Sequence, residues 1–199
     1  MHFINHLSKD RKLKKLIDVH GVLTLKKERN ICLHLCYSIM SQQLSVKVAD
    51  VFCKRFLSLF EGKEPTALEI SKTKFEKLRS IGLSNAKATY VLNVAHFDLE
   101  YGLQAKKLHK MGDEDIIAYL TQIKGVGRWT AEMLLMFALA REDHFSQDDL
   151  GLQKAMAKLY KLDTSNKKQF REDMLRISSK WRPYRTYACL YLWKLNDIK

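Results

Sequence analysis

The chain has 199 residues, and 46% of them are hydrophobic, which is enough to build the core of one domain or of two closely joined lobes. Only 8 glycines and 2 prolines occur, and so low a content disfavours long loops and an all-β architecture. The 35 lysines and arginines exceed the 22 acidic residues and give a net charge of +13, which points to a polyanionic partner, nucleic acid before membrane. A basic surface without such a partner is the alternative.

The first half of the chain reads as a series of helices. Ile31, Leu35 and Ile39 recur at the spacing of one helix face. The short loop "SQQLS" at residues 41–45 separates this helix from a second one. The segments 71–82 and 84–98 predict two further helices, and Gly82 and Ser84 between them have the character of a helix stop and an N-cap.

The second half continues the pattern. Residues 113–123 predict a helix, and residues 130–140 predict another that is apolar on every side, as expected of a buried central helix. The run 133–140 is the longest uninterrupted apolar stretch, and it is too short to cross a bilayer. Three helices complete the chain, and Pro183 suits the first turn of the last one. The expected fold is therefore all-α, with eight to ten helices.

Two glycines bracket a valine between the helices predicted at 113–123 and 130–140. A nucleotide-binding G-x-G-x-x-G motif is rejected, because its third glycine would fall at Thr130 and the preceding segment is helical, not a strand. A helix-hairpin-helix remains. Gly125 would end the first helix in the left-handed region, and Gly127 would leave bare N–H groups at the start of the second, where a DNA phosphate could approach. The alternative is an ordinary tight turn between packed helices.

The segment "LTQIKGVGRWTAEML" followed by "HFSQDDLGLQ" resembles the helix-hairpin-helix (HhH-GPD) base-excision DNA glycosylases, and most closely their DNA-3-methyladenine glycosylase II branch. The hairpin is matched, and so is an aspartate about twenty residues after its bulky side chain, since Asp149 lies 20 residues after Trp129. The segments "IMSQQLSVKVA", "IGLSNAKATYVLNVA" and "WRPYRTYACLYLW" match in kind and order. The resemblance covers residues 31–193.

The resemblance implies a single two-lobed helical domain over residues 1–199, with lobe one at about 31–140 and lobe two formed by about 1–30 and 141–199. It also implies a monomeric enzyme that flips and hydrolytically excises alkylated purines, such as 3-methyladenine, from double-stranded DNA. Membrane is not an expected partner. The expected location is the cytoplasm, at the nucleoid, or the nucleus of a eukaryote.

Trp129 occupies the position at which bifunctional relatives carry a nucleophilic lysine, so the resemblance implies a monofunctional enzyme that uses water. Asp149 is the expected catalytic carboxylate, which would stabilise the oxocarbenium character of the sugar. Either aspartate of the pair could instead simply cap the following helix, and Asp148 is the expected structural partner. Trp129 and Trp193 match pocket positions that would face a cationic methylated base, and Met133 stands where some relatives carry an aromatic residue.

Gln43 in "SQQLS" matches the position that is inserted into the gap left by the flipped base, and Leu44 is second choice. Capping of the next helix is the alternative for this loop. The residues expected to contact DNA at the hairpin are Lys124, Gly125, Val126, Gly127, Arg128 and Thr130. The resemblance allows a structural sodium or potassium ion there, held by the backbone carbonyls of Thr121, Ile123 and Val126.

No cofactor is expected to be required. The chain has no cysteine cluster near its C-terminus, so an iron–sulfur cluster is not expected. Cys32 and Cys36 are interpreted as core thiols and not as zinc ligands, because His34 between them would point away on a helix.

The sequence is also compatible with two other functions. One is a non-catalytic helix-hairpin-helix module that binds DNA regardless of damage. The other is a bifunctional glycosylase/lyase for oxidised bases, which Trp129 disfavours.

Overall fold

A computed structural model describes residues 2–197, and the residues it describes are helical with no strand. The all-α prediction is confirmed, but the described residues form thirteen α-helices and one 3₁₀ helix, more than the eight to ten expected. The chain divides into two compact units. The hairpin unit comprises residues 27–139, and the terminal unit joins residues 2–26 to residues 140–197. Each unit is described separately below, and neither contains a helix long and apolar enough to cross a membrane among the residues described.

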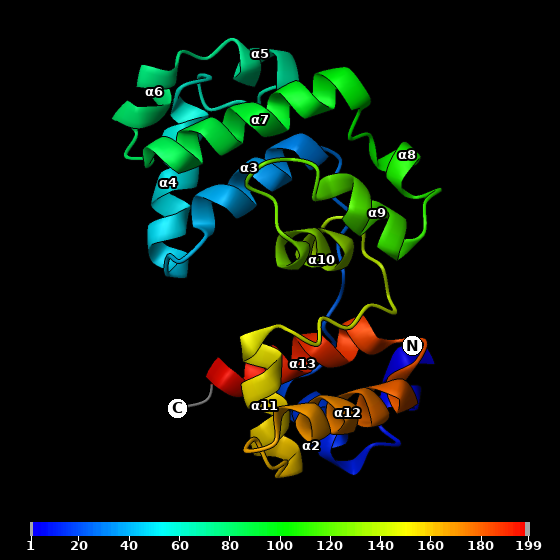
Figure 1. The fold of residues 1–199 in the computed structure, drawn as a ribbon. Helices are drawn as coiled ribbons and strands as arrows, with labels where there is room; N and C mark the ends of the chain where they lie inside the picture. Colours follow the sequence, from blue (N-terminus) through cyan, green and yellow to red (C-terminus); the bar gives the residue numbers. More distant parts are fainter. Residues whose placement is uncertain (1, 198–199) are drawn as a thin grey trace. The chain divides into compact units, whose positions relative to one another are not determined.

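The hairpin unit is built around two long helices, α3 and α7, which lie against each other (Figure 1). The predicted face of α3 is confirmed, since Ile31, Leu35 and Ile39 are all buried in the core. Ser84 caps α7 as predicted, accepting the Lys87 amide at 3.2 Å. The helices of this unit are α3 (Ile31–Ser41), α4 (Val46–Ser58), α5 (Ala67–Ser71), α6 (Phe75–Ser80), α7 (Asn85–Tyr101), α8 (Ala105–Leu108), α9 (Asp113–Leu120) and α10 (Arg128–Phe137).

Helix α10 is the buried helix that the sequence predicts, but it is shorter than expected. It ends at Phe137, not at residue 140. The Leu139 amide reaches back to the Leu134 carbonyl at 3.0 Å and closes the helix. Leu139 remains buried after the helix has ended, so the apolar pattern continues past the point where the helical backbone stops.

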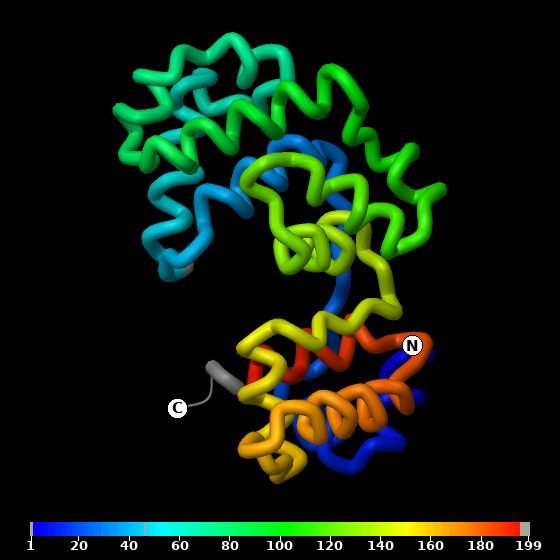
Figure 2. The backbone as a smooth tube through the Cα atoms, in the orientation of Figure 1, coloured from blue at the N-terminus to red at the C-terminus, as the bar shows by residue number. Residues whose placement is uncertain are grey.

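The terminal unit brings the two ends of the chain together. Figure 2 shows the first helices beside the last one, and α2 packs directly against α13. Asp10 caps α2 and also accepts hydrogen bonds from the Tyr160 hydroxyl at 2.7 Å and the Trp181 indole at 3.2 Å. Trp181 is buried in the core of this unit. The helices of this unit are α1 (His2–Leu7), α2 (Arg11–His20), α11 (Leu150–Tyr160), α12 (Lys167–Ser178), the 3₁₀ helix η1 (Ser179–Trp181) and α13 (Arg185–Asp197).

One prediction about the terminal unit was wrong. Pro183 does not lie in the first turn of the last helix, because α13 begins at Arg185. Tyr187 and Tyr191 are buried in the core, and Tyr184 is partly buried. Tyr191 donates to the Gly21 carbonyl at 2.8 Å and so ties α13 to the end of α2.

Candidate functional site

The hairpin at residues 121–127 joins α9 to α10 and needs glycine at one position. Gly125 has a φ of 109°, in the region that favours glycine, as predicted. A Cβ added at Gly125 would lie 2.3 Å from Cγ of Tyr90, so the ring of Tyr90 fills the space that a side chain would need. The turn is completed by the Val126 amide, which donates to the Ile123 carbonyl at 2.9 Å.

Gly127 serves a different purpose. It is the N-cap of α10, its φ is −89°, and it provides no side-chain cap. A Cβ at Gly127 would meet nothing within 4 Å, so neither the backbone nor the packing of the chain requires glycine here. The consequence is that no side chain at this position covers the N–H groups that begin α10. Such groups, together with the helix dipole, attract anions.

Arg128 and Thr130 are placed differently from the other predicted DNA contacts. The Arg128 guanidinium donates to both carboxylate oxygens of Glu114, at 2.7 and 3.0 Å, and to Oε1 of Glu132 at 3.1 Å. The hydrogen bond to Glu114 is the main cause that raises the pKa of Arg128. Arg128 therefore fastens the start of α9 to the start of α10, and its charge is balanced within the protein. Thr130 is buried, whereas Lys124 is exposed.

The loop at residues 41–45 presents Gln43 at an exposed position with a φ of 61°, an uncommon conformation for a residue other than glycine. Leu44 is partly buried. Ser45 is the N-cap of α4 but makes no side-chain capping bond. The neighbouring Gln42, which sequence reasoning did not single out, directs its amide towards the Gly125 carbonyl at 3.4 Å and the Thr130 hydroxyl at 3.5 Å.

Asp149 is the N-cap of α11, and its side chain is buried. Its Oδ1 accepts the Leu152 amide at 2.7 Å and the indole N–H of Trp193 at 3.0 Å. Gly151 packs closely against both groups, since a Cβ there would lie 3.0 Å from Oδ1 of Asp149 and 3.1 Å from Cδ1 of Trp193. Asp149 thus caps a helix and also presents an oriented, buried carboxylate, so the capping role does not exclude the catalytic one.

Asp148 lies in a different environment. Its side chain is half exposed and forms an ion pair with Arg171 of α12. The structure therefore separates the two aspartates into a surface residue and a buried one.

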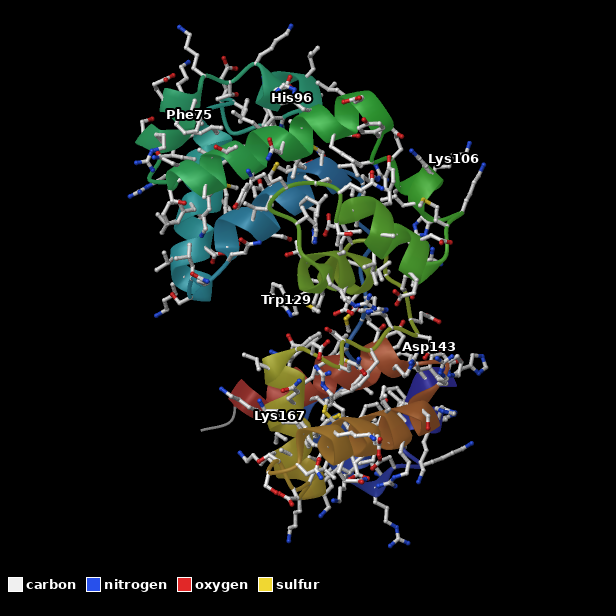
Figure 3. The ribbon with its side chains drawn as sticks, in the orientation of Figure 1. Phe75, His96, Lys106, Trp129, Asp143 and Lys167 are labelled. Carbon is white, nitrogen blue, oxygen red and sulfur yellow. The ribbon has the colours of Figure 1, made fainter. Side chains whose placement is uncertain are left out.

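Helix α13 holds the segment that leads to Asp149. Arg185 donates from Nε to Oδ1 of Asp143 at 2.7 Å, at the position labelled in Figure 3. The buried Thr186 hydroxyl accepts the His144 amide at 2.9 Å and donates to the Arg141 carbonyl at 2.5 Å. These partners are more than 40 residues apart in sequence, and no local pattern identifies them.

Cys189 lies further along α13 and is fully buried. Burial is the main cause that raises the pKa of its thiol, and the charge of Asp149 raises it further. Cys189 therefore remains protonated near the carboxylate. With Arg185 and Trp193, it makes α13 the support for the Asp149 segment.

The three predicted pocket residues fall in two groups. Trp129 and Met133 lie one turn apart on α10, Trp129 with 47% of its surface exposed and Met133 buried. Figure 3 labels Trp129 at the first turn of this helix. Trp193 belongs to the terminal unit, where it contacts Asp149. Its indole N–H bond to the carboxylate is a role that the sequence did not predict.

Cys32 and Cys36 are buried free thiols of α3, as predicted. Across residues 2–197, no three histidine, cysteine or acidic side chains are grouped so that they could hold a metal ion. The hairpin carbonyls that the resemblance suggests as cation ligands are neutral oxygens within one tight turn, a donor set that suits a monovalent cation.

Comparison with known proteins identifies a family and close relatives. The family model of the HhH-GPD superfamily base excision DNA repair proteins matches residues 36–180. DNA-3-methyladenine glycosylase 1 of Schizosaccharomyces pombe is 36% identical over 82% of this chain and 72% of its own length. A solved structure of the 3-methyladenine DNA glycosylase of that yeast, in complex with abasic DNA, has a TM-score of 0.87 and 32% identity and covers 100% of this chain and 98% of that one.

A second solved structure gives the same result. The DNA-3-methyladenine glycosidase of Bacillus halodurans has a TM-score of 0.82 and 33% identity, and the match covers 96% of this chain and 87% of that one. The likeness therefore extends over both units and is not confined to the hairpin.

Proposed function

The chain belongs to the HhH-GPD superfamily of base excision DNA repair proteins, and from this premise we propose that it is a monofunctional DNA glycosylase. It hydrolyses the N-glycosidic bond of alkylated purines, such as 3-methyladenine, in double-stranded DNA. The observation that carries the proposal is the buried carboxylate of Asp149, oriented by the Leu152 amide and the Trp193 indole. The names of the relatives support the same activity.

Asp149 acts on the sugar. As the bond from C1′ to the base nitrogen breaks, its electron pair leaves with the base and C1′ acquires positive charge. A fixed carboxylate stabilises this charge without having to reorganise, and it also orients the attacking water and accepts its proton. The water oxygen then forms the new bond to C1′. Because two hydrogen bonds end on Oδ1, the carboxylate has one orientation before substrate arrives.

Trp129 and Trp193 act on the base. A purine methylated at a ring nitrogen is cationic, and an indole face attracts such a cation by about 0.5–2 kcal/mol. The exposure of Trp129 leaves its large aromatic surface accessible to a ligand. An indole has no amine that could form a Schiff base, so water is the nucleophile. Met133, one turn further along α10, lines the base pocket with a more flexible side chain than the aromatic residue of some relatives.

The hairpin binds the DNA backbone. The N–H groups at the start of α10 receive a phosphate beside Gly127, with Lys124 exposed next to the turn. A sodium or potassium ion held by the carbonyls of Thr121, Ile123 and Val126 would add positive charge there.

Gln43 fills the gap left by the extruded base. The protein works as a monomer in the compartment that contains DNA, the cytoplasm of a bacterium or the nucleus of a eukaryote.

The direct test of this function is release of free base. DNA treated with a methylating agent and the same DNA left untreated are incubated with the protein, and free purines are separated by chromatography. We expect methylated purines from the treated DNA and no purine from the control. A non-catalytic module would bind both DNAs and release nothing, and that result would refute the proposal.

Gly127→Asp is expected to weaken binding to duplex DNA of any sequence without impairing folding. The space around Gly127 accepts a side chain, but the added carboxylate repels the phosphate at the start of α10. Affinity measured from about 50 to 200 mM salt should fall steeply for the wild type and less steeply for the variant, which has lost a phosphate contact. Ser80→Asp places the same charge on the exposed end of α6 as a control. An equal loss of affinity in both variants would mean that only net charge matters.

A further inference from the structure

Helix α7 supports both the loop that carries Gln43 and the hairpin. Lys87 donates from Nζ to the carbonyls of Met40 and Gln42, each at 2.8 Å. These two carbonyls lie at the end of α3 and at the start of the loop, immediately before Gln43. Burial lowers the pKa of Lys87, in keeping with an ammonium group that is turned inwards to the backbone.

The same side of α7 also holds the hairpin. Tyr90, three residues after Lys87, packs its ring against Gly125. Asn93, three residues further on, donates from Nδ2 to the Lys124 carbonyl at 3.2 Å. Residues spaced by three lie on neighbouring positions of a helix surface. One strip of α7 therefore sets the position of the loop relative to the hairpin, and Gln42 links the two directly.

The link between the loop and the hairpin matters because Gln43 has to keep its position while a base is extruded from the duplex. Its φ of 61° is costly for a residue with a side chain and persists only where the surroundings enforce it. Extrusion of a base requires unstacking and unpairing, so the inserted residue must not retreat while the hairpin holds the backbone. A loop that is not held in place would move away from the duplex, and the base would stay stacked.

We propose that Lys87 is a positioning residue for base extrusion, which fixes the Gln43 loop on the hairpin through the carbonyls of Met40 and Gln42. The inference rests on the proposed function, since it assigns the means by which that function reaches a base inside a duplex. Lys87 acts through the loop and contacts neither the base nor the sugar.

The test replaces Lys87 with methionine, which keeps an unbranched apolar side chain but has no donor. Lys77→Met removes the same charge from an exposed position of α6 and is the matched control. Lys87→Arg is the rescue variant, because its guanidinium can again donate to two carbonyls. Base release is measured for each variant from a duplex and from a single strand containing the same methylated purine. Hydrogen exchange of residues 40–45 is followed in the free protein.

Lys87→Met should slow base release from the duplex by about tenfold or more, because two charge-assisted hydrogen bonds are lost. Base release from the single strand should be unchanged. The loop amides should exchange faster, Lys77→Met should change neither measurement, and Lys87→Arg should recover part of the duplex rate. Equal losses on both substrates would overturn the proposal, as would a loss matched by Lys77→Met.

The exchange measurement needs no turnover and separates this inference from the proposed function. If the wild type releases no base from either substrate, the proposed function fails. Faster exchange in Lys87→Met would still support the anchoring of the loop, and unchanged exchange would refute it. Weaker DNA binding with unchanged exchange would make Lys87 a phosphate contact, which also refutes the inference.

Discussion

Asp149→Asn should lower the rate of base release by about 10²–10³, which corresponds to about 3–4 kcal/mol of lost transition-state stabilisation. Asparagine retains Oδ1, so it can still accept the Leu152 amide and the Trp193 indole, and the start of α11 should keep its geometry. What is lost is the negative charge that faces the developing positive charge on the sugar. Single-turnover release from methylated duplex DNA measures the effect. Binding to a duplex with an abasic site should stay the same or tighten, because an anion near the DNA has been removed.

Asp148→Asn is the internal control. It removes an acidic charge next to Asp149, but from an exposed ion pair with Arg171, and exposed pairs contribute only about 0–1 kcal/mol to stability. We expect this variant to keep most of its activity. If Asp148→Asn were inactive and Asp149→Asn active, the roles of the two aspartates would be reversed. Full base release by both variants would show that neither carboxylate takes part in the reaction.

Gly125→Ala should destabilise the protein by about 2–5 kcal/mol and abolish tight DNA binding. Part of the cost arises because alanine is strained at a φ of 109°, and part because its Cβ would overlap the ring of Tyr90. The hairpin can relieve the overlap only by moving away from α7, which displaces the N–H groups at the start of α10. Urea unfolding measures the loss of stability, and titration with an abasic-site duplex measures the loss of binding.

Two further variants separate these causes. Tyr90→Ala removes the ring from beside Gly125 but keeps its own Cβ, which would lie 2.6 Å from the added Cβ. Adding Gly125→Ala to it should therefore cost less than in the wild type, and the two changes should be non-additive. Gly127→Ala should leave stability nearly unchanged, because its Cβ meets open space. If Gly125→Ala were as stable as Gly127→Ala, the tight fit of the hairpin against Tyr90 would be wrong.

The features that the sequence predicted correctly depend on residues that are close together in the chain. The apolar spacing of Ile31, Leu35 and Ile39 places them on one buried face, and the capping residue Ser84 identifies the start of α7. Gly125 adopts the positive φ expected of the residue that ends the first helix of the hairpin. A sequence pattern could not decide whether Asp149 is a helix cap or a candidate catalytic residue. In the structure the two roles do not exclude each other, since the capping carboxylate is also buried.

The features that were missed depend on contacts between distant parts of the chain. Trp193 meets Asp149 across 44 residues, and Lys87 meets Gln42 across 45. Periodicity indicates which face of a helix is buried, but it does not indicate which polar atom a side chain will meet there. The ion pair of Arg128 with Glu114 is a further example, because no local pattern indicates that these two side chains meet.

Helix ends were missed for a related reason. Leu139 is as apolar as the residues of α10 and remains buried after the helix has closed, so hydrophobicity alone could not place the end at Phe137.

The most direct test of the account is a borohydride trap during turnover on a duplex that contains one methylated purine. On the proposed function Trp129 stands in place of a nucleophilic lysine, so hydrolysis should yield free base and abasic sites in equal amounts, with strands intact until alkali is added. No protein–DNA adduct should accumulate when borohydride is present from the start. Efficient trapping of an adduct, together with strand cleavage as fast as base release, would show that an amine of this protein attacks the sugar. Lys124 would be the first candidate for that amine. The hydrolytic mechanism assigned to Asp149 would then be wrong.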